Sequence, residues 1–436
     1  FVPRAGQAYN YNPTNFFQRP DDRFNSGFFG KYEVSDNAEV YVDMTYMKSE
    51  SNAQIAYSGT FGNITSLPCY NAFLSEQQYN AACGDWTGMG GDHAPDFASG
   101  AAALAYLANL DLAVGDGSIL GYKAPLYSLK RNVEGNPRQS IFAYKSFTQT
   151  VGVRGDINDN WSYDAYYQTS NVVYNNEYRN DLSVTAINRA VDVVSVNGVP
   201  TCVSALNGTD STCVPYNLFQ GGLPGDQGIQ GVLDGGQELQ SYIANSTYIN
   251  GDGEQTTFTA YVTGDTGYSI PGAPGNVSVV AGFESRELSS DFRPDLPSRT
   301  GDRSGSGGAT LPLGGTYDVD EFFVELGIPV TDTVSMDAGF RSADYSTGND
   351  TTAMKLGAFW TVNDKVSVRG SFQTSQRHAN LAELYQGIGQ GLVDLDYDPC
   401  GIDPDTGAAP IATQAQCENT GLPANLYGTD LKSPAD

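Results

Sequence analysis

Apolar and polar residues alternate with a period of two over unusually long stretches of this chain. Residues 27–47, GFFGKYEVSDNAEVYVDMTYM, carry apolar side chains at most even positions, before and after a turn at 35–38. The odd positions are mainly polar or charged. Side chains of an extended strand point alternately to opposite faces, so this pattern predicts two strands that each have one apolar and one polar face. The apolar face consists of Phe28, Val34, Val40, Val42 and Met44.

The same alternation recurs four more times and predicts about ten strands in five hairpins. The further hairpins pair 147–154 with 161–168, 254–265 with 277–287, 321–328 with 334–341, and 354–360 with 366–373. The turns inside the hairpins are short, but the connections at 57–138, 179–253 and 295–314 are far longer than those of a compact soluble domain. Long strands with short turns at one end and long loops at the other are typical of a transmembrane β-barrel.

A soluble β-sandwich or a large β-solenoid with loop insertions would also show alternation. The polar face is rich in ionisable groups, Gln, Ser and Thr, which suits a water-filled or plugged lumen. Aromatic residues near the strand ends suit the girdles at a membrane surface; they are Tyr32, Tyr46, Trp161 and Trp360. We therefore expect an all-β antiparallel barrel whose apolar face meets lipid.

Composition narrows the classes of partner and compartment. The chain of 436 residues has 23 Lys and Arg against 50 Asp and Glu, a net charge of −27, so nucleic acid is not an expected partner. No run of about 18 apolar residues predicts a transmembrane helix, and the first residues do not resemble a signal peptide.

The six cysteines fall into three groups of two within polar, glycine-rich loops. Spacing alone permits several connectivities. Local pairing is the simplest reading, and it predicts an oxidising compartment. The expected pairs are Cys69 with Cys83, Cys202 with Cys213, and Cys400 with Cys417.

No catalytic motif is found, so we expect neither an enzyme nor a cofactor. The two histidines, His93 and His378, do not suffice for a zinc site. Asp394, Asp396 and Asp398 have a spacing that could serve Ca²⁺, but Pro399 replaces the glycine that a calcium loop needs, so a solvated acidic loop is favoured.

Arginines and loop aromatics are the candidate ligand-binding residues. The arginines expected on the lumen face could contact an anionic solute, although pairing with acidic neighbours is the favoured alternative. Trp86 and Tyr216 could stack on a solute, but loop aromatics such as Tyr70, Tyr79 and Phe219 are equally often packing anchors. The segments 75–86 and 183–196 are expected to be short loop helices. The candidate arginines are Arg154, Arg286, Arg341, Arg369 and Arg377.

Several motifs resemble those of TonB-dependent outer-membrane receptors, particularly of sphingomonad- and caulobacter-like bacteria. They include AYNYNPTNFFQRPDDR before the first hairpin, GFESRELSSDFRPD at 282–295, GFRSADYST at 339–347 and VRGSFQTSQRHANLAELYQG at 368–387. The last departs from the family pattern, which has Ala-Pro where this chain has His378-Ala379. The resemblance implies energised uptake of a siderophore, vitamin or oligosaccharide, driven by the TonB complex through a plug domain.

The resemblance also implies how the chain is divided. Residues 1–20 are expected to be an extracellular loop, 21–378 barrel strands, and 379–436 a further extracellular loop. The plug and the C-terminal strands of a family barrel of about 22 strands are expected to lie outside this sequence. A non-transporting surface barrel or adhesin that acts through acidic loops is the alternative function.

Overall fold

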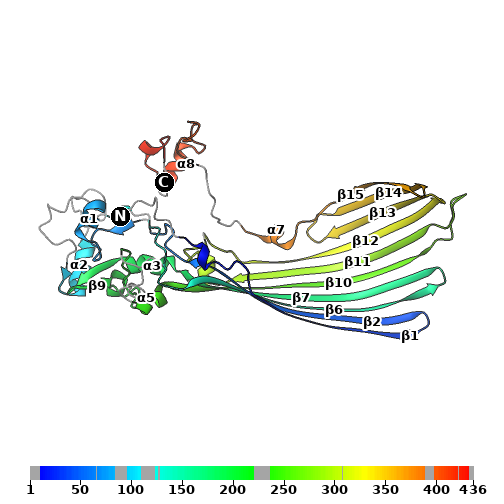
Figure 1. The fold of residues 1–436 in the computed structure, drawn as a ribbon, viewed down its shortest axis with the longest axis horizontal. Helices are drawn as coiled ribbons and strands as arrows, with labels where there is room; N and C mark the ends of the chain where they lie inside the picture. The colour runs from blue at the N-terminus through cyan, green and yellow to red at the C-terminus, as the bar shows by residue number, and fades with distance from the viewer. Residues whose placement is uncertain are drawn as a thin grey trace.

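One ten-stranded antiparallel sheet dominates the computed structural model, which makes the chain an all-β, barrel-like protein (Figure 1). The structure describes residues 10–64, 66–83, 96–109, 123–125, 128–219, 236–306, 308–387, 397–420 and 422–431. The strands, in the order in which they pair, are β1 (Asp21–Ser35), β2 (Ala38–Tyr57), β6 (Pro137–Asn158), β7 (Trp161–Leu182), β10 (Ala244–Asp265), β11 (Ser278–Pro294), β12 (Leu313–Thr331), β13 (Val334–Tyr345), β14 (Thr351–Asn363) and β15 (Val366–Thr374).

These strands lie where the alternation predicts them, and most extend beyond the alternating stretches. β6, β7 and β10 have 22 residues each and span about 70 Å at roughly 3.3 Å per residue. Turns join the strands at one end of the sheet, and much longer segments join most of them at the other, apart from the short connection 346–350 (Figure 1). Polar residues beyond the apolar stretch continue the hydrogen-bonded ladder, because backbone pairing does not depend on side-chain polarity.

The register places the alternating apolar residues of the ten strands on the same face of the sheet. Val42 pairs with Val151, Phe283 with Phe322, and Leu356 with Phe372, so each apolar position meets another on the next strand. This apolar face is largely exposed; Phe322 keeps 63% and Phe372 keeps 69% of its surface accessible. Its members include Phe28, Val40, Val42, Met44, Val151, Val153, Phe258, Phe283, Phe322, Val324, Phe340, Leu356, Trp360, Val368 and Phe372.

The apolar face is slanted relative to the hydrogen-bonded rows. One continuous row joins Tyr32 of β1 to Thr352 of β14 through every strand between them. The turn after Tyr32 lies close to this row. The turn after Thr352, eight strands away, lies about eight residues further from the row. At about 3.3 Å per residue and 4.8 Å per strand, this displacement corresponds to a strand tilt of about 35°. That is the tilt at which strands close into a barrel.

The loop ends pack into a separate module with its own small cores. Two small sheets lie here: β3 (Ser66–Pro68) pairs with β5 (Lys123–Pro125), and β4 (Asp96–Phe97) joins β8 (Val193–Val196) and β9 (Val199–Cys202). The helices are α1 (Glu76–Ala82), α2 (Gly100–Asn109), α3 (Val184–Val191), α4 (Val203–Leu206), α5 (Gly236–Ile243) and α6 (Leu296–Thr300). The largest core joins Ile64, Leu182, Ile187, Ala190, Val191, Tyr216, Leu239 and Ile243. This set is called the loop core below.

Local sequence explains where these loop helices begin. Ser75 opens α1 with a capping box that involves Gln78, and the Ser183 hydroxyl accepts the Ala186 N–H at the start of α3. Short helices were expected in both segments. The second expectation was too long, since 193–196 forms strand β8 rather than helix; Val193 and Val194 are buried, and the strand pairs with β9.

The remaining short elements lie outside the large sheet. They are η1 (Asn12–Thr14), α7 (Leu381–Tyr385), α8 (Gln414–Asn419) and η4 (Ala424–Leu426). In the part of the chain that the structure describes, no helix has the length and apolar character needed to cross a membrane.

Candidate functional site

The polar face of the sheet carries interleaved acidic and basic side chains near the short turns. Glu39 of β2 forms an ion pair with Lys31 at 3.0 Å and accepts hydrogen bonds from Arg154 at 2.6 and 2.9 Å. The Arg154 guanidinium also lies over the ring of Tyr41, 5.0 Å from its centroid. These residues belong to β1, β2 and β6, so the register alone brings them together.

A second group of hydrogen-bonded polar side chains extends this charged cluster onto β7 and β10. Tyr41 donates a hydrogen bond to Asp164 at 2.8 Å, and Tyr261 donates to the same carboxylate at 3.5 Å. The hydroxyl end of the Tyr41 ring lies over Gly152, where a β-carbon would have no space. The glycine therefore allows the phenol to reach Asp164 across the intervening strand.

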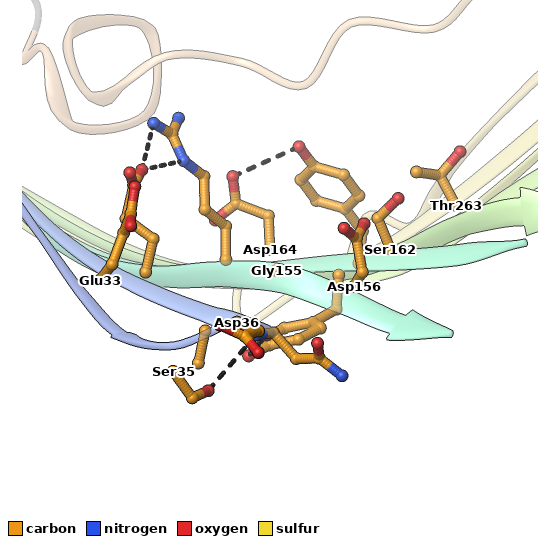
Figure 2. Close-up of a pocket in the computed structure, with 14 residues that line it drawn as sticks. Glu33, Ser35, Asp36, Gly155, Asp156, Ser162, Asp164 and Thr263 are labelled. Atoms are coloured by element: carbon orange, nitrogen blue, oxygen red, sulfur yellow. Dashed lines mark hydrogen bonds and ion pairs between the residues drawn. The ribbon is translucent and has the colours of Figure 1, made fainter. Parts of the chain in front are cut away.

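These residues line an open hollow of about 670 Å³ at the turn end of the polar face (Figure 2). Among the described residues that line the hollow, Arg154 is the only basic one, and its guanidinium donates two hydrogen bonds to Glu39. The acidic residues of the lining are Glu33, Asp36, Glu39, Asp156 and Asp164. The hollow therefore favours cationic or neutral groups over anionic ones.

A third group lies on β11, β12 and β13. Glu321 is almost fully buried and binds both Arg286 and Arg341 through its two carboxylate oxygens. Glu284 completes the cluster: its Oε1 lies 3.0 Å from Arg286 and 3.4 Å from Arg341, and its Oε2 accepts a hydrogen bond from Thr259. This is the acidic pairing that the sequence favoured over a role in binding an anionic solute.

The other two candidate arginines lie elsewhere. Arg369 is on the polar face of β15 and exposed, and no ion pair of its side chain is found among the described residues. Arg377 follows the end of β15 and lies on no face of the sheet, contrary to expectation. It makes two hydrogen bonds of 2.7 and 2.8 Å to Glu383 and so braces α7.

The segment that carries Arg377 folds back onto the polar face. His378 stacks on Tyr345 with ring centroids 3.9 Å apart and hydrogen-bonds Thr347 at 2.7 Å. Leu381 and Leu384 pack against the cluster around Tyr317. The stacking of His378 on Tyr345 and its hydrogen bond to Thr347 hold the bend that follows β15.

The loop aromatics are packing anchors in this structure. Tyr216 is only 1% exposed and belongs to the loop core, where its hydroxyl meets the Lys130 ammonium at 3.0 Å. Tyr70 is also buried and donates to Asp192 at 2.7 Å; burial raises the pKa of that carboxyl, although the hydrogen bond from Tyr70 opposes the shift. Trp86 lies outside the described residues.

The disulfides and the acidic loop belong to the same end of the molecule. The structure joins Cys69 to Cys83, Cys202 to Cys213 and Cys400 to Cys417, the local arrangement favoured by the sequence. Asp398 accepts the Cys400 N–H at a turn, whereas Asp394 and Asp396 lie outside the described residues. Within the described ranges, no group of three or more acidic, histidine or cysteine side chains could hold a metal ion.

Sequence reasoning missed the residues at the centre of the polar clusters. Glu39, Asp164 and Glu321 were recognisable as polar-face positions, but their roles depend on which strands become neighbours. Asp181 was also missed; it is fully buried and accepts hydrogen bonds from Ser58 and Ser304, which tie the end of β7 to two loop segments. The sequence separations of 123 residues on either side explain why no local signal marks it.

Comparisons with known proteins find distant similarity to solved structures. No family model and no curated protein sequence matches the chain. The ferric-catecholate import receptor Fiu from E. coli K12 is similar at 12% identity and a TM-score of 0.40, over 83% of this chain and 44% of the receptor, so the chain spans less than half of that protein.

Two other membrane proteins are similar at lower scores. The CymD monoaromatic hydrocarbon channel has 9% identity and a TM-score of 0.28, over 81% of this chain and 68% of the channel. The translocator domain of the autotransporter NalP from Neisseria meningitidis has 9% identity and a TM-score of 0.23, over 82% of this chain and 81% of the domain.

Proposed function

We propose that the ten strands form part of the wall of a β-barrel in the bacterial outer membrane, with the short turns in the periplasm and the loop module outside the cell. The observation that carries this proposal is the exposed apolar face that runs across all ten strands at barrel tilt. Soluble monomers rarely expose apolar patches beyond a few hundred Å². Lipid would cover the whole face at once.

The distribution of polar groups along the strands supports the same placement. On the apolar side, charged residues follow the apolar stretch toward the loops; they are Lys48 on β2, Lys145 on β6, Glu254 on β10 and Glu287 on β11. Trp161 and Trp360 lie at the opposite, turn end. An apolar stretch bounded by charges on one side and indole rings on the other suits a lipid core between two polar interfaces.

Within such a barrel, we propose a receptor function: binding of a scarce solute outside the cell and its energised uptake through the TonB complex. Support comes from the resemblance at the strand-end motif and from the disulfide-braced loops, which suit a preorganised binding surface. The TonB contact would belong to a plug outside the strands described here. The solute would be moved without chemical conversion.

Two measurements test this function. Outer membranes should contain the native polypeptide as a heat-modifiable band, and its N-terminal sequence and intact mass should reveal a plug ahead of Phe1. Deletion of the gene should then abolish uptake of one solute in a manner that also requires TonB. Normal uptake of every tested solute, or a native polypeptide without a plug, would refute the receptor function.

A non-transporting surface barrel or adhesin is the second candidate. The packed loop module and the chain's net charge of −27 favour it, because both suit a contact surface outside the cell. Loss of surface adhesion with unchanged uptake in the deletion strain would select this alternative.

A further inference from the structure

Part of the polar face differs from the charged hollow, because it carries no charge. Two successive hydrogen-bonded rows across β1, β2, β6, β7, β10, β11 and β12 contain only uncharged residues. One row runs from Asn25 to Gly315, and the next runs from Gly27 to Tyr317. These rows lie between the loop module and the arginine–carboxylate clusters.

Aromatic rings stand at the loop edge of this uncharged region. Tyr144 and Tyr174 face each other across β6 and β7 with centroids 5.0 Å apart, and Tyr144 is 39% exposed. Phe292 of β11 lies in the same row, separated from Tyr174 by Gly251. A β-carbon at Gly251 would meet both the Tyr174 and the Phe292 ring at 3.7 Å, so the two rings flank the glycine from opposite sides.

The floor next to these rings is open. A β-carbon at Gly253 would meet only a backbone oxygen at 3.7 Å. At Gly315, by contrast, the ring of Tyr385 already occupies the space above the glycine. The sheet therefore leaves room at Gly253 that no side chain of the described residues fills.

Neutral hydrogen-bonding groups lie in the row next to Gly253. Thr148 and Ser170 share a hydrogen bond of 3.1 Å. Gln255 donates one amide N–H to Thr257 at 3.2 Å, and within the described ranges its other N–H and its carbonyl oxygen have no recorded partner. An amide has two donors and an acceptor, so Gln255 retains capacity for a ligand hydroxyl.

We propose that this region is a binding subsite for a neutral sugar ring, formed by Tyr144, Tyr174 and Phe292 as stacking surfaces and by Thr148, Ser170 and Gln255 as hydrogen-bonding groups. Aromatic rings bind the apolar face of a sugar, and hydroxyls and amides match its rim of hydroxyl groups. The absence of charge in both rows disfavours an anionic chelate. This inference rests on the proposed function, because it places the subsite on the solute path below the loops.

Binding is tested by calorimetry on the full-length protein in detergent, with maltohexaose, cellohexaose and xylohexaose as neutral probes and an iron(III) tris-catecholate, which is a trianion, as the charged probe. We expect one neutral hexasaccharide to bind. Tyr174→Ala and Phe292→Ala should each raise the Kd of this hexasaccharide by about tenfold. Tyr167→Ala and Phe258→Ala, which truncate rings on the opposite face of β7 and β10, should change it less than twofold.

The inference is overturned if no neutral hexasaccharide binds at millimolar concentration, if the matched controls weaken binding as much as the subsite variants, or if the tris-catecholate binds and depends on Tyr174. Gln255→Ala truncates no ring and should also weaken binding. It tests the subsite even if an aromatic variant fails to fold. Membrane fractionation distinguishes this failure from failure of the proposed function. If the protein is found in the outer membrane but binds no sugar, only the subsite inference is rejected.

Discussion

A charge placed in the apolar stretch gives the sharpest test of the lipid-facing assignment. Val262 and Thr263 are adjacent on β10 and point to opposite faces of the sheet. Val262 pairs with Ala281 in the middle of the apolar stretch, whereas Thr263 lines the acidic hollow. Arginine at these two positions therefore meets lipid in one variant and carboxylates in the other.

The two variants should differ by a few kcal/mol in the free energy of unfolding. Arginine on the lipid face of a barrel costs about 2–4 kcal/mol at the bilayer midplane and about 0–1 kcal/mol near the interface. Val262→Arg should therefore cost about 3 kcal/mol. Thr263→Arg should cost less than about 1 kcal/mol, because the lumen is wet and the neighbouring side chains are acidic.

The cost of an arginine at different depths along the strand distinguishes lipid from a layer of protein that covers the apolar face. Val173 is on the same face as Val262 but in the row of Lys145 and Asp252, beyond the apolar stretch. Val173→Arg should cost less than about 1 kcal/mol, since it would lie at the interface. A packed protein layer would give no such gradient along the strand.

Urea unfolding of the full-length protein in phospholipid vesicles, followed by tryptophan fluorescence, measures all three free energies. Equal costs for Val262→Arg and Thr263→Arg would refute the assignment of the two faces. Equal costs for Val262→Arg and Val173→Arg would refute lipid as the covering medium.

The remaining predictions concern the loop end. Leu239→Ala should destabilise the loop module by about 2–5 kcal/mol, because Leu239 is fully buried in the loop core, and hydrogen exchange should rise there while the sheet is unchanged. Replacing Cys202 and Cys213 by serine should lower the stability of their loop by about 3 kcal/mol, measured as faster proteolytic cleavage within it; unchanged cleavage would contradict the disulfide's role. The hydrogen bonds of Arg377 and of the Asn380 N–H lower the pKa of Glu383 from 4.5 to about 2, so their contribution to the α7 fold should be complete above about pH 4.5 and lost as the pH falls toward 2. Hydrogen exchange of residues 376–386 should show this loss, and Glu383→Gln should remove the pH dependence.

The strands and their faces could be predicted from local pattern, because alternation is a property of consecutive residues. The five hairpins from Phe28 to Val368 needed no knowledge of tertiary contacts. The cysteine pairs were accessible for the same reason, since 11 to 17 residues separate the partners.

The sites depended on information that the local pattern does not contain. Arg377 continues the parity of β15, but the strand ends at Thr374, and the chain then turns to bind Glu383. Tyr216 was interpreted as a possible ligand contact because it lies in a polar loop, yet the folded loop buries it against Lys130.

The sequence by itself determined which residues share a face, because side-chain direction in a strand follows from residue parity. Only the tertiary structure decided which faces meet. Asp164 acquires Tyr41 as its partner because β2, β6 and β7 lie in register, although 123 residues separate the two in the chain. The placement of Tyr174 and Phe292 on either side of Gly251 arises in the same way, since strand pairing places two rings and a glycine from three strands in one row.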